Sequence, residues 1–329
     1  MKKKIERLED SIDERIREIG GEGELFSPAP YDPTQAEMGG YSNYSYWRST
    51  LKSFRRNYMA MFCLFLLALL LLFTMIQPLF PGQHGPTEIN WLENGRTDSN
   101  HAPDGTFIFG TNSIGQDLWA RVWSGTRTSL LIGLCVAACN AVIGILVGAL
   151  WGYVRSLDRF LTEVYNVIHN IPRNIILILV SYLARPGVGT IIFAMCITGW
   201  LPMARFIRNQ IVTIRDLEYN LASRCLGTPT GRIITRNLLP YLVSVITLRI
   251  SLAIPQAIGS EVFLTYIGLG LPVTIPSLGN LINEGRAVMM APASRYQLIF
   301  PAIILSVITI SFYVIGNAFA DSADPKNHV

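Results

Sequence analysis

Long apolar segments alternate with polar stretches along most of this chain. Residues 59–76 are uncharged and nearly all large and apolar, and five further segments have comparable length. The six segments are 59–76, 128–153, 160–184, 188–204, 241–263 and 298–318. Because about 20 apolar residues make a helix long enough to cross a membrane, the pattern predicts an all-α, polytopic membrane protein with six transmembrane helices.

The composition supports this class of protein. Half of the 329 residues are hydrophobic, 15% are charged, and the mean hydropathy is +0.35. Such values are typical of a membrane protein and not of a soluble enzyme. The sequence has no Gly-x-x-x-x-Gly-Lys-Ser/Thr phosphate loop, no convincing Ser/His/Asp set and no metal-ligand spacing. We therefore expect no catalytic residues, no metal site and no cofactor on this chain, and no nucleic-acid partner.

Small residues within the second segment predict close helix packing. Gly144, Gly148 and Gly152 recur at every fourth position, and in lipid this spacing lets two helices approach each other. Cys135 and Cys139 are one helical turn apart, and none of the five cysteines forms a CxxC pair. Packing is therefore favoured over a disulfide or a metal site for the cysteines.

Charged residues interrupt the third and fifth segments. Pro172 is expected to kink the third segment, which also carries Glu163 and Arg173. Charges at membrane depth are costly and usually face a cavity or one another, so the kinked helix is a candidate to line a solute path, with Arg173 able to meet a carboxylate. Alternatively, its first turns project into the cytoplasm and leave Glu163 solvated. Arg249 and Glu261 in the fifth segment complete a candidate solute path.

A charged stretch, residues 217–240, separates the fourth and fifth apolar segments. Its pattern predicts a helix with Asp216 as N-cap, an end at Gly227 with Pro229 behind it, and a second basic helix over 231–238. Three leucines are predicted to share one face of the first helix: Leu217, Leu221 and Leu226. An apolar ridge flanked by arginines is suited to a groove in a soluble partner; the alternative is an ordinary amphipathic loop helix.

The spacing within this stretch resembles the coupling loop of permease subunits of ABC importers. That loop has Glu-Ala-Ala, three residues, Gly, nine residues and Ile-x-Leu-Pro. The matching positions here are Ala222, Ser223, Gly227, Leu239 and Pro240. Two positions depart from the pattern, since Leu221 stands for the Glu and Asn237 for the Ile. Glu218, one turn earlier, is a candidate to supply the acidic group.

A second resemblance lies before the second apolar segment. Residues 109–117, Phe-Gly-Thr-Asn-Ser-Ile-Gly-Gln-Asp, resemble the Phe-Gly-Thr-Asp-x-x-Gly-Arg-Asp run of C-type permeases in dipeptide and oligopeptide ABC importers, a wider family that includes nickel importers. Asn112 and Gln116 replace the usual Asp and Arg. We expect Asp117 and Arg121 to pair at i, i+4, and the motif to anchor the span without touching substrate. Residues 261–270, 276–279 and 284–286 continue the resemblance as an outer hairpin.

The resemblance implies a type I ABC importer permease fold and a set of partners. These are a second homologous permease, two ABC ATPase subunits that hold ATP and Mg²⁺, and an extracellular or periplasmic solute-binding protein. The six coupling-loop residues would pass ATPase motion into alternating access, and the implied solute is a dipeptide or oligopeptide. Two alternatives remain: transport of nickel or another small solute, and, in a different class, a passive channel or membrane scaffold.

Charge distribution predicts the orientation in a bacterial cell membrane. With both termini placed in the cytoplasm, most of the 27 Lys and Arg residues fall on the cytoplasmic side, as the positive-inside rule requires. The outer segments contain Arg96, Arg121, Arg185, Arg286 and Arg295.

The same pattern divides the chain into regions. A cytoplasmic tail, 1–57, precedes the first span and external loop, 58–126; a permease core, 127–320, contains the coupling loop 213–240; and 321–329 form a second cytoplasmic tail. Apolar residues repeat at helical spacing near the start of the first tail and predict a short amphipathic helix, followed by a linker at 20–40. These residues are Ile5, Leu8, Ile12, Ile16 and Ile19.

Overall fold

The structure, a computed structural model, describes residues 46–323, with side chains from residue 49. The amphipathic helix and linker predicted near the N-terminus lie outside this range. The chain divides into two compact units, 1–49 and 50–329, and apart from the first residues of helix α4 (Tyr46–Arg56) the elements below belong to the second. Within residues 46–323, β-structure is confined to two isolated bridges, so the described part is all-α as predicted.

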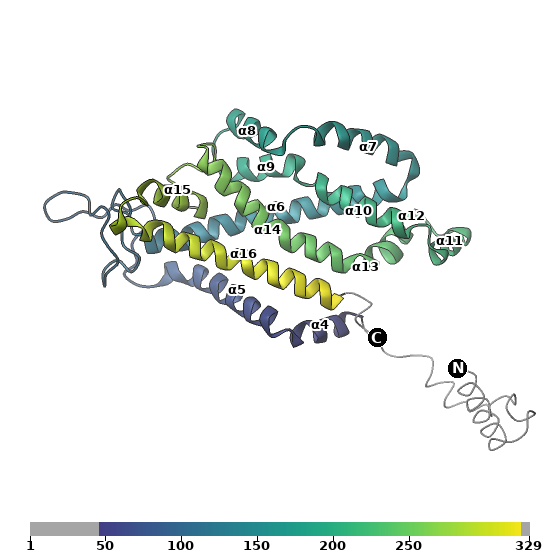
Figure 1. The fold of residues 1–329 in the computed structure, drawn as a ribbon, viewed down its shortest axis with the longest axis horizontal. Coiled ribbons are helices and arrows are strands. Elements are labelled where there is room, and N and C mark those ends of the chain that lie inside the picture. Colours follow the sequence, from purple (N-terminus) through teal and green to yellow (C-terminus); the bar gives the residue numbers. More distant parts are fainter. Residues whose placement is uncertain (1–45, 324–329) are drawn as a thin grey trace, which may run out of the picture. The chain divides into compact units, whose positions relative to one another are not determined.

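Within residues 46–323, five helical segments are long and apolar enough to cross a membrane. They are Tyr58–Leu79, Leu118–Tyr153, Val188–Ile214, Val243–Tyr266 and Pro292–Ala323. Figure 1 shows them running side by side, with α15 (Leu278–Val288) near one end and α11 (Glu218–Cys225) near the other. The third predicted span, 160–184, contains only a shorter apolar helix, Arg173–Leu183, so a count of six spans depends on that helix.

The first span, α5 (Tyr58–Ile76), begins one residue before the predicted start. Asn57 caps it, because its Oδ1 accepts a hydrogen bond from the backbone N–H of Ala60 at 3.1 Å. One side of α5 packs on α16 (Tyr296–Ala323). The preceding helix α4 also contacts α16, since the ring centroids of Phe54 and Phe319 lie 5.8 Å apart. The other side of α5 exposes large apolar side chains suited to lipid: Met59, Phe62, Phe65, Leu69, Leu72 and Met75.

A polar loop, residues 77–117, connects α5 to the second span after a short 3-10 turn, η1 (Gln77–Leu79). His101 lies between two carboxylates, with Nε2 2.8 Å from Asp104 Oδ2 and Nδ1 3.0 Å from Asp98 Oδ1. The hydrogen bond with Asp104, and then that with Asp98, raises the pKa of His101 above its ordinary value. The Tyr296 hydroxyl donates toward the carbonyl oxygens of His101 and Thr111 and so ties the loop to α16.

The second span, α6 (Leu118–Tyr153), is 36 residues long and begins ten residues before the predicted start. The predicted boundary at 126/127 therefore falls inside a helix. Its three spaced glycines lie against α10 (Leu201–Ile214), which confirms the predicted close packing. A Cβ at Gly148 would come within 2.5 Å of the carbonyl oxygen of Ala204, so only glycine fits at this contact without displacement.

The third segment is two helices where one kinked helix was predicted. α7 (Arg155–His169) ends before Asn170, and α8 (Arg173–Leu183) begins after Pro172. Glu163 is exposed on α7. Asp158 on α7 forms a two-point ion pair with Arg208 on α10, at 2.9 and 2.7 Å; hydrogen bonding from Arg208 lowers the pKa of this carboxyl. The ion pair fastens α7 to α10.

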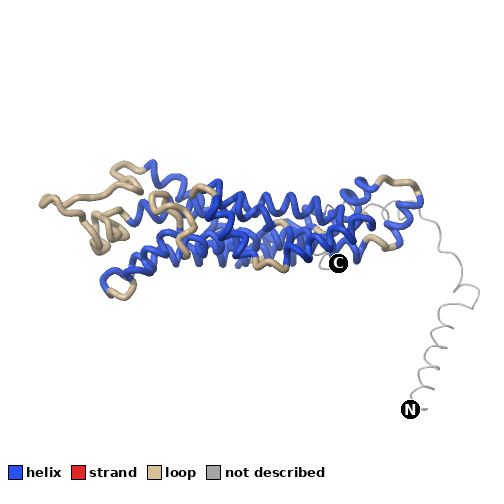
Figure 2. Tube along the Cα trace, turned by 90° about the horizontal axis from the view of Figure 1, so that it is seen from above, coloured by secondary structure: helices blue, strands red, loops and turns tan. Residues whose placement is uncertain are grey.

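The remaining spans are α-helices. α9 (Val188–Gly199) and α10 join at Trp200 into one candidate span. α14 (Val243–Tyr266) stays helical through Pro255 and Gly259. The 3-10 turn η3 (Pro292–Ser294) precedes α16. Figure 2 shows the longest loops gathered toward the ends of the helices.

Candidate functional site: a coupling segment and an arginine-lined cavity

The coupling segment, residues 215–240, leaves the end of α10 and folds into short helices (Figure 1). The N-cap of α11 is Leu217, which makes no side-chain cap bond, so the prediction of Asp216 as N-cap is wrong. The Asp216 carboxylate instead faces three guanidinium groups, at 3.4 Å from Arg155, 3.4 Å from Arg215 and 3.8 Å from Arg224.

The end of α11 follows the prediction. Gly227 has a φ of +76°, a conformation that L side chains rarely adopt. Its N–H donates to the Arg224 carbonyl at 2.9 Å, and the N–H of Thr228 donates to the Ser223 carbonyl at 3.1 Å. This pair of bonds is the Schellman arrangement that ends helices at glycine.

The second helix of the segment is more irregular than the predicted basic helix over 231–238. It comprises α12 (Thr230–Ile233), the π-helical turn η2 (Ile234–Leu238) and the short α13 (Leu239–Tyr241). Apolar side chains from this stretch are buried against α10 and α14. They are Ile233, Ile234 and Leu238, with Leu239 partly buried beside them.

Two asparagines that no sequence motif marks as functional hold the segment together. Asn220 on α11 is fully buried, and its Nδ2 donates to the Ile214 carbonyl at the end of α10 at 2.9 Å. The Nδ2 of Asn237 lies 3.3 Å from Asn220 Oδ1 and 3.4 Å from Ser223 Oγ. Asn237 is the position at which the family pattern has Ile, so this departure carries a contact of its own.

The predicted coupling residues divide between the surface and the base of the segment. Glu218 and Ala222 are exposed on α11, and Ser223 beside them is half-buried. Leu239 and Pro240 lie where η2 leads into α14. The predicted leucine ridge is exposed, and Leu226 reaches 86% exposure. The segment therefore presents an apolar surface on a base packed against two spans.

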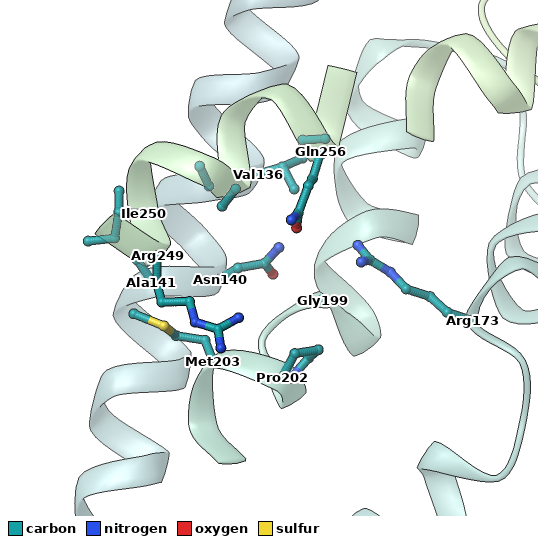
Figure 3. Close-up of a pocket in the computed structure, with 13 residues that line it drawn as sticks. Val136, Asn140, Ala141, Arg173, Gly199, Pro202, Met203, Arg249, Ile250 and Gln256 are labelled. Atoms are coloured by element: carbon teal, nitrogen blue, oxygen red, sulfur yellow. The ribbon is translucent and has the colours of Figure 1, made fainter. Parts of the chain in front are cut away.

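A cavity of about 80 Å³ lies among α6, α8, α9, α10 and α14. Two of the three candidate solute-path residues, Arg173 and Arg249, line it together with Asn140 and Gln256. Figure 3 shows Arg173, Asn140 and Gln256 pointing toward one another across this space. A larger adjoining cavity, about 280 Å³, shares Arg173 and Pro202 with the first. Arg173 thus stands between the two cavities.

Glu261, the third candidate, lies apart from the arginines. Its carboxylate is fully buried and accepts hydrogen bonds from Ser277 at 2.8 Å, Thr265 at 3.2 Å and Ser129 at 3.3 Å. These hydroxyls come from α6, α14 and the cap of α15. The geometry gives Glu261 a position at the junction of three helices and not in the cavity lining.

The charged residues of the motif before α6 form other contacts than the predicted ion pair. Asp117 caps α6 by accepting from the N–H of Trp119 at 3.0 Å, so the predicted Asp117–Arg121 pair does not form. The fully buried Arg121 binds Glu284 on α15 at 2.7 Å and also contacts Gln116. The Nδ2 of Asn112 lies 3.3 Å from Glu284. The two departures from the family motif, Asn112 and Gln116, therefore join the network that fixes α15 to α6.

Family comparisons agree with this architecture. Residues 140–329 match the family described as binding-protein-dependent transport system inner membrane component. Residues 45–103 match the N-terminal transmembrane domain of oligopeptide transport permease C. The chain belongs to the family of binding-protein-dependent transport permeases, and with its apolar helices it is a multi-pass membrane protein.

Individual relatives cover most of the chain. It is 40% identical to the oligopeptide transport system permease protein AmiD of Streptococcus pneumoniae, over 87% of this chain and 91% of the relative. It is 31% identical to the oligopeptide permease OppC of Bacillus subtilis (92% and 97% covered) and 34% identical to the dipeptide permease DppC of the same organism (86% and 86%). The resemblance to C-type peptide permeases drawn from the motifs is thereby confirmed.

A solved structure supports the fold. The MetNI methionine ABC transporter, in an inward-facing conformation, matches with a TM-score of 0.50 at 20% identity, covering 61% of this chain and 96% of that one. Together with the family match, this confirms the predicted ABC importer permease fold.

Proposed function

We propose that this chain is the membrane-spanning permease subunit of an ATP-driven, binding-protein-dependent importer of peptides. The names of the similar permeases, which refer to oligopeptide and dipeptide transport, support the solute class. The coupling segment carries the mechanical part of the proposal, because its exposed apolar helix is hydrogen-bonded to the end of a span.

The subunit works with partners in this proposal. A second homologous permease completes the pathway, and two ABC ATPase subunits bind ATP and Mg²⁺ and dock on the coupling segments. An external solute-binding protein delivers peptide near α15. This chain holds no cofactor itself, and its role is to move between two arrangements of its spans as the ATPases close and open.

In this proposal, motion of the ATPases passes from α11 through α10 and α6 to α15. An ATPase pushing on Ala222 and Leu226 moves α11, which is joined to α10 by the bond from Asn220 to the Ile214 carbonyl. α10 in turn lies against α6 at Gly148, where the backbones approach too closely for a Cβ. Close-packed helices transmit displacement because they cannot compress. The outer ends of α6 and α15 then move together through Arg121 and Glu284.

The proposed orientation places both termini and the coupling segment in the cytoplasm of a bacterial cell. The charge bias around the short loops supports it. Accessibility of single cysteines tests it, in a chain whose five native cysteines are replaced. Leu226→Cys, exposed in the coupling segment, should react only with reagents that reach the cytoplasm, and Ile108→Cys, exposed in the 77–117 loop, with reagents added outside. The reverse pattern would overturn the topology.

Reconstitution of the full complex in proteoliposomes tests the function itself. We expect uptake of a labelled peptide that needs ATP, both ATPase subunits and the solute-binding protein. The same vesicles are offered labelled nickel as the alternative solute, and the arginines of the cavity disfavour a free divalent cation. Uptake of nickel without peptide would favour the alternative, and equal uptake without the ATPases would favour a passive channel.

A further inference from the structure

The two arginines of the cavity lack a counter-charge within the part of the chain that is described. Neither Arg173 nor Arg249 takes part in an ion pair within residues 49–323. The buried Nε of Arg173 has no hydrogen-bond partner there, and the guanidinium of Arg249 lies over the ring of Phe206, 4.4 Å from its centroid. Cations within membrane segments are costly and usually find a compensating group, so an anion is expected to enter.

A neutral polar side chain is buried beside the arginines. Asn140 on α6 is 8% exposed, and its buried Oδ1 has no partner among the described residues. A Cβ at Gly199 would come within 2.4 Å of Asn140 Nδ2, so glycine there makes room for the amide. The amide N–H groups of Asn140 and Gln256 supply hydrogen-bond donors beside the two guanidinium groups.

This combination of donors fits a carboxylate. A guanidinium presents paired N–H groups that match the two oxygens of a carboxylate, and charge-assisted bonds of this kind are strong in a site shielded from water. The cavity contains two such guanidinium groups from different helices, α8 and α14, and none of the described residues that line it is acidic. An occupant that brings its own negative charge completes the site.

We propose that Arg173 and Arg249, with Asn140 and Gln256, form a binding site for the carboxylate of a passing peptide. This inference rests on the proposed peptide transport and adds a recognition point on the path. Because Arg173 and Arg249 come from two separate helices, α8 and α14, a carboxylate between them is held only while these helices remain near each other. Separation of the helices in the opposite state would release it.

The test compares peptide acids with peptide amides in the reconstituted complex. Each peptide is supplied as the free C-terminal acid and as the C-terminal amide, and the ratio of their uptake rates is measured for wild type and variants. The solute-binding protein is the same throughout, so its own preference cancels when ratios are compared. Arg249→Gln is the principal variant because Arg249 is exposed, so that its replacement removes only the contact with the Phe206 ring. Arg173→Gln is the second, and Arg173→Lys retains the charge.

We expect Arg249→Gln and Arg173→Gln to lower the acid-to-amide ratio by about tenfold or more, because each removes a charge-assisted interaction. Arg173→Lys is expected to retain part of the preference. The control is Arg185→Gln, an exposed arginine in the turn between α8 and α9, and it should leave the ratio unchanged. Membrane levels and basal ATPase activity of each variant establish that the complex assembles.

Two kinds of failure are distinguishable. Wild-type complexes that import neither peptide form would contradict the proposed function. Wild-type complexes that import peptide, with Arg249→Gln reducing acid and amide equally, would overturn the carboxylate site alone. That second outcome is also the one expected if a carboxylate of the second permease occupies the arginines, since peptide chemistry would then not matter.

Discussion

The side-chain amides of Asn220 and Asn237 lie 3.3 Å apart, Nδ2 of Asn237 to Oδ1 of Asn220, across the turn of the coupling segment. Asn220 is fully buried and also donates to the Ile214 carbonyl. A buried amide is costly to leave unpaired, so the two asparagines and the end of α10 behave as one unit. The surface that an ATPase would contact is in this way fixed to a span.

Replacement of Asn237 by Leu tests this unit. The change removes the donor to Asn220 and leaves a buried acceptor unsatisfied, which costs about 1–3 kcal/mol. We expect peptide uptake per ATP hydrolysed to fall severalfold while the protein still reaches the membrane. Thr235→Ala is the matched control, because Thr235 is exposed and its hydroxyl donates to the Gly231 carbonyl within the same helical stretch. Equal loss in both variants would contradict a specific role for the asparagine pair.

Gly227 provides a backbone test of coupling. Proline there requires a φ near −65° and removes the N–H that bonds to Arg224, whereas the native φ is +76°. We expect Gly227→Pro to abolish uptake with the protein still in the membrane. Gly227→Asn is the control, since asparagine tolerates the left-handed conformation, and it should retain most activity.

A charge on the exposed face of α11 tests docking instead of folding. Ala222 is exposed, so Ala222→Asp leaves the internal packing unchanged but places a carboxylate on the surface proposed to meet the ATPase. We expect uptake to be abolished and co-purification of the ATPase subunits to weaken. Normal uptake together with normal co-purification would count against this surface as the docking site.

His101 makes the 77–117 loop sensitive to pH. Its pKa is raised by hydrogen bonds to Asp104 and Asp98, so the charged imidazole stabilises the loop below the ordinary histidine pKa of about 6.5. This contribution is lost as the pH rises through the higher pKa of the folded state. We expect NMR titration to place His101 above 6.5, and Asp104→Asn to lower it. A His101 pKa unaffected by Asp104→Asn would contradict the assignment.

The sequence predicted the spans better than their contacts, for a physical reason. Uniformly apolar helices such as α5 are evident from hydropathy. The predicted start of α5 differs from the observed start by one residue. The start of α6 was predicted too late, because its first turns contain Arg121 and a charged residue is not expected in contact with lipid. In the folded chain Arg121 is buried by protein contacts instead. Arg121 pairs with Glu284, 163 positions away, and no local spacing indicates such a pair.

The candidate site was predictable only in part for the same reason. Charge within apolar segments identified Arg173 and Arg249, but it also selected Glu261. The Glu261 carboxylate lies outside the cavity lining and accepts hydrogen bonds from three hydroxyl groups. Asn140 and Gln256, polar residues within predicted apolar spans, were the available signal for the two cavity residues that were missed. The role of Gly199 follows only from its distance to Asn140 in the folded chain.

The close contact between α6 and α10 can be tested with two glycine-to-alanine replacements, one inside the contact and one outside it. They are expected to shift the thermal midpoint in opposite directions. Alanine has the higher helix propensity, by about 1 kcal/mol. At Gly259, exposed on α14, an added Cβ meets nothing within 4 Å, so Gly259→Ala should raise the thermal midpoint slightly. At Gly148 the added Cβ would lie 2.5 Å from the Ala204 carbonyl oxygen, a backbone atom that cannot rotate away. Overpacking of this kind costs about 1–3 kcal/mol, so Gly148→Ala should lower the midpoint of the purified subunit in detergent. Equal midpoints for the two variants would mean that α6 and α10 are not in close backbone contact.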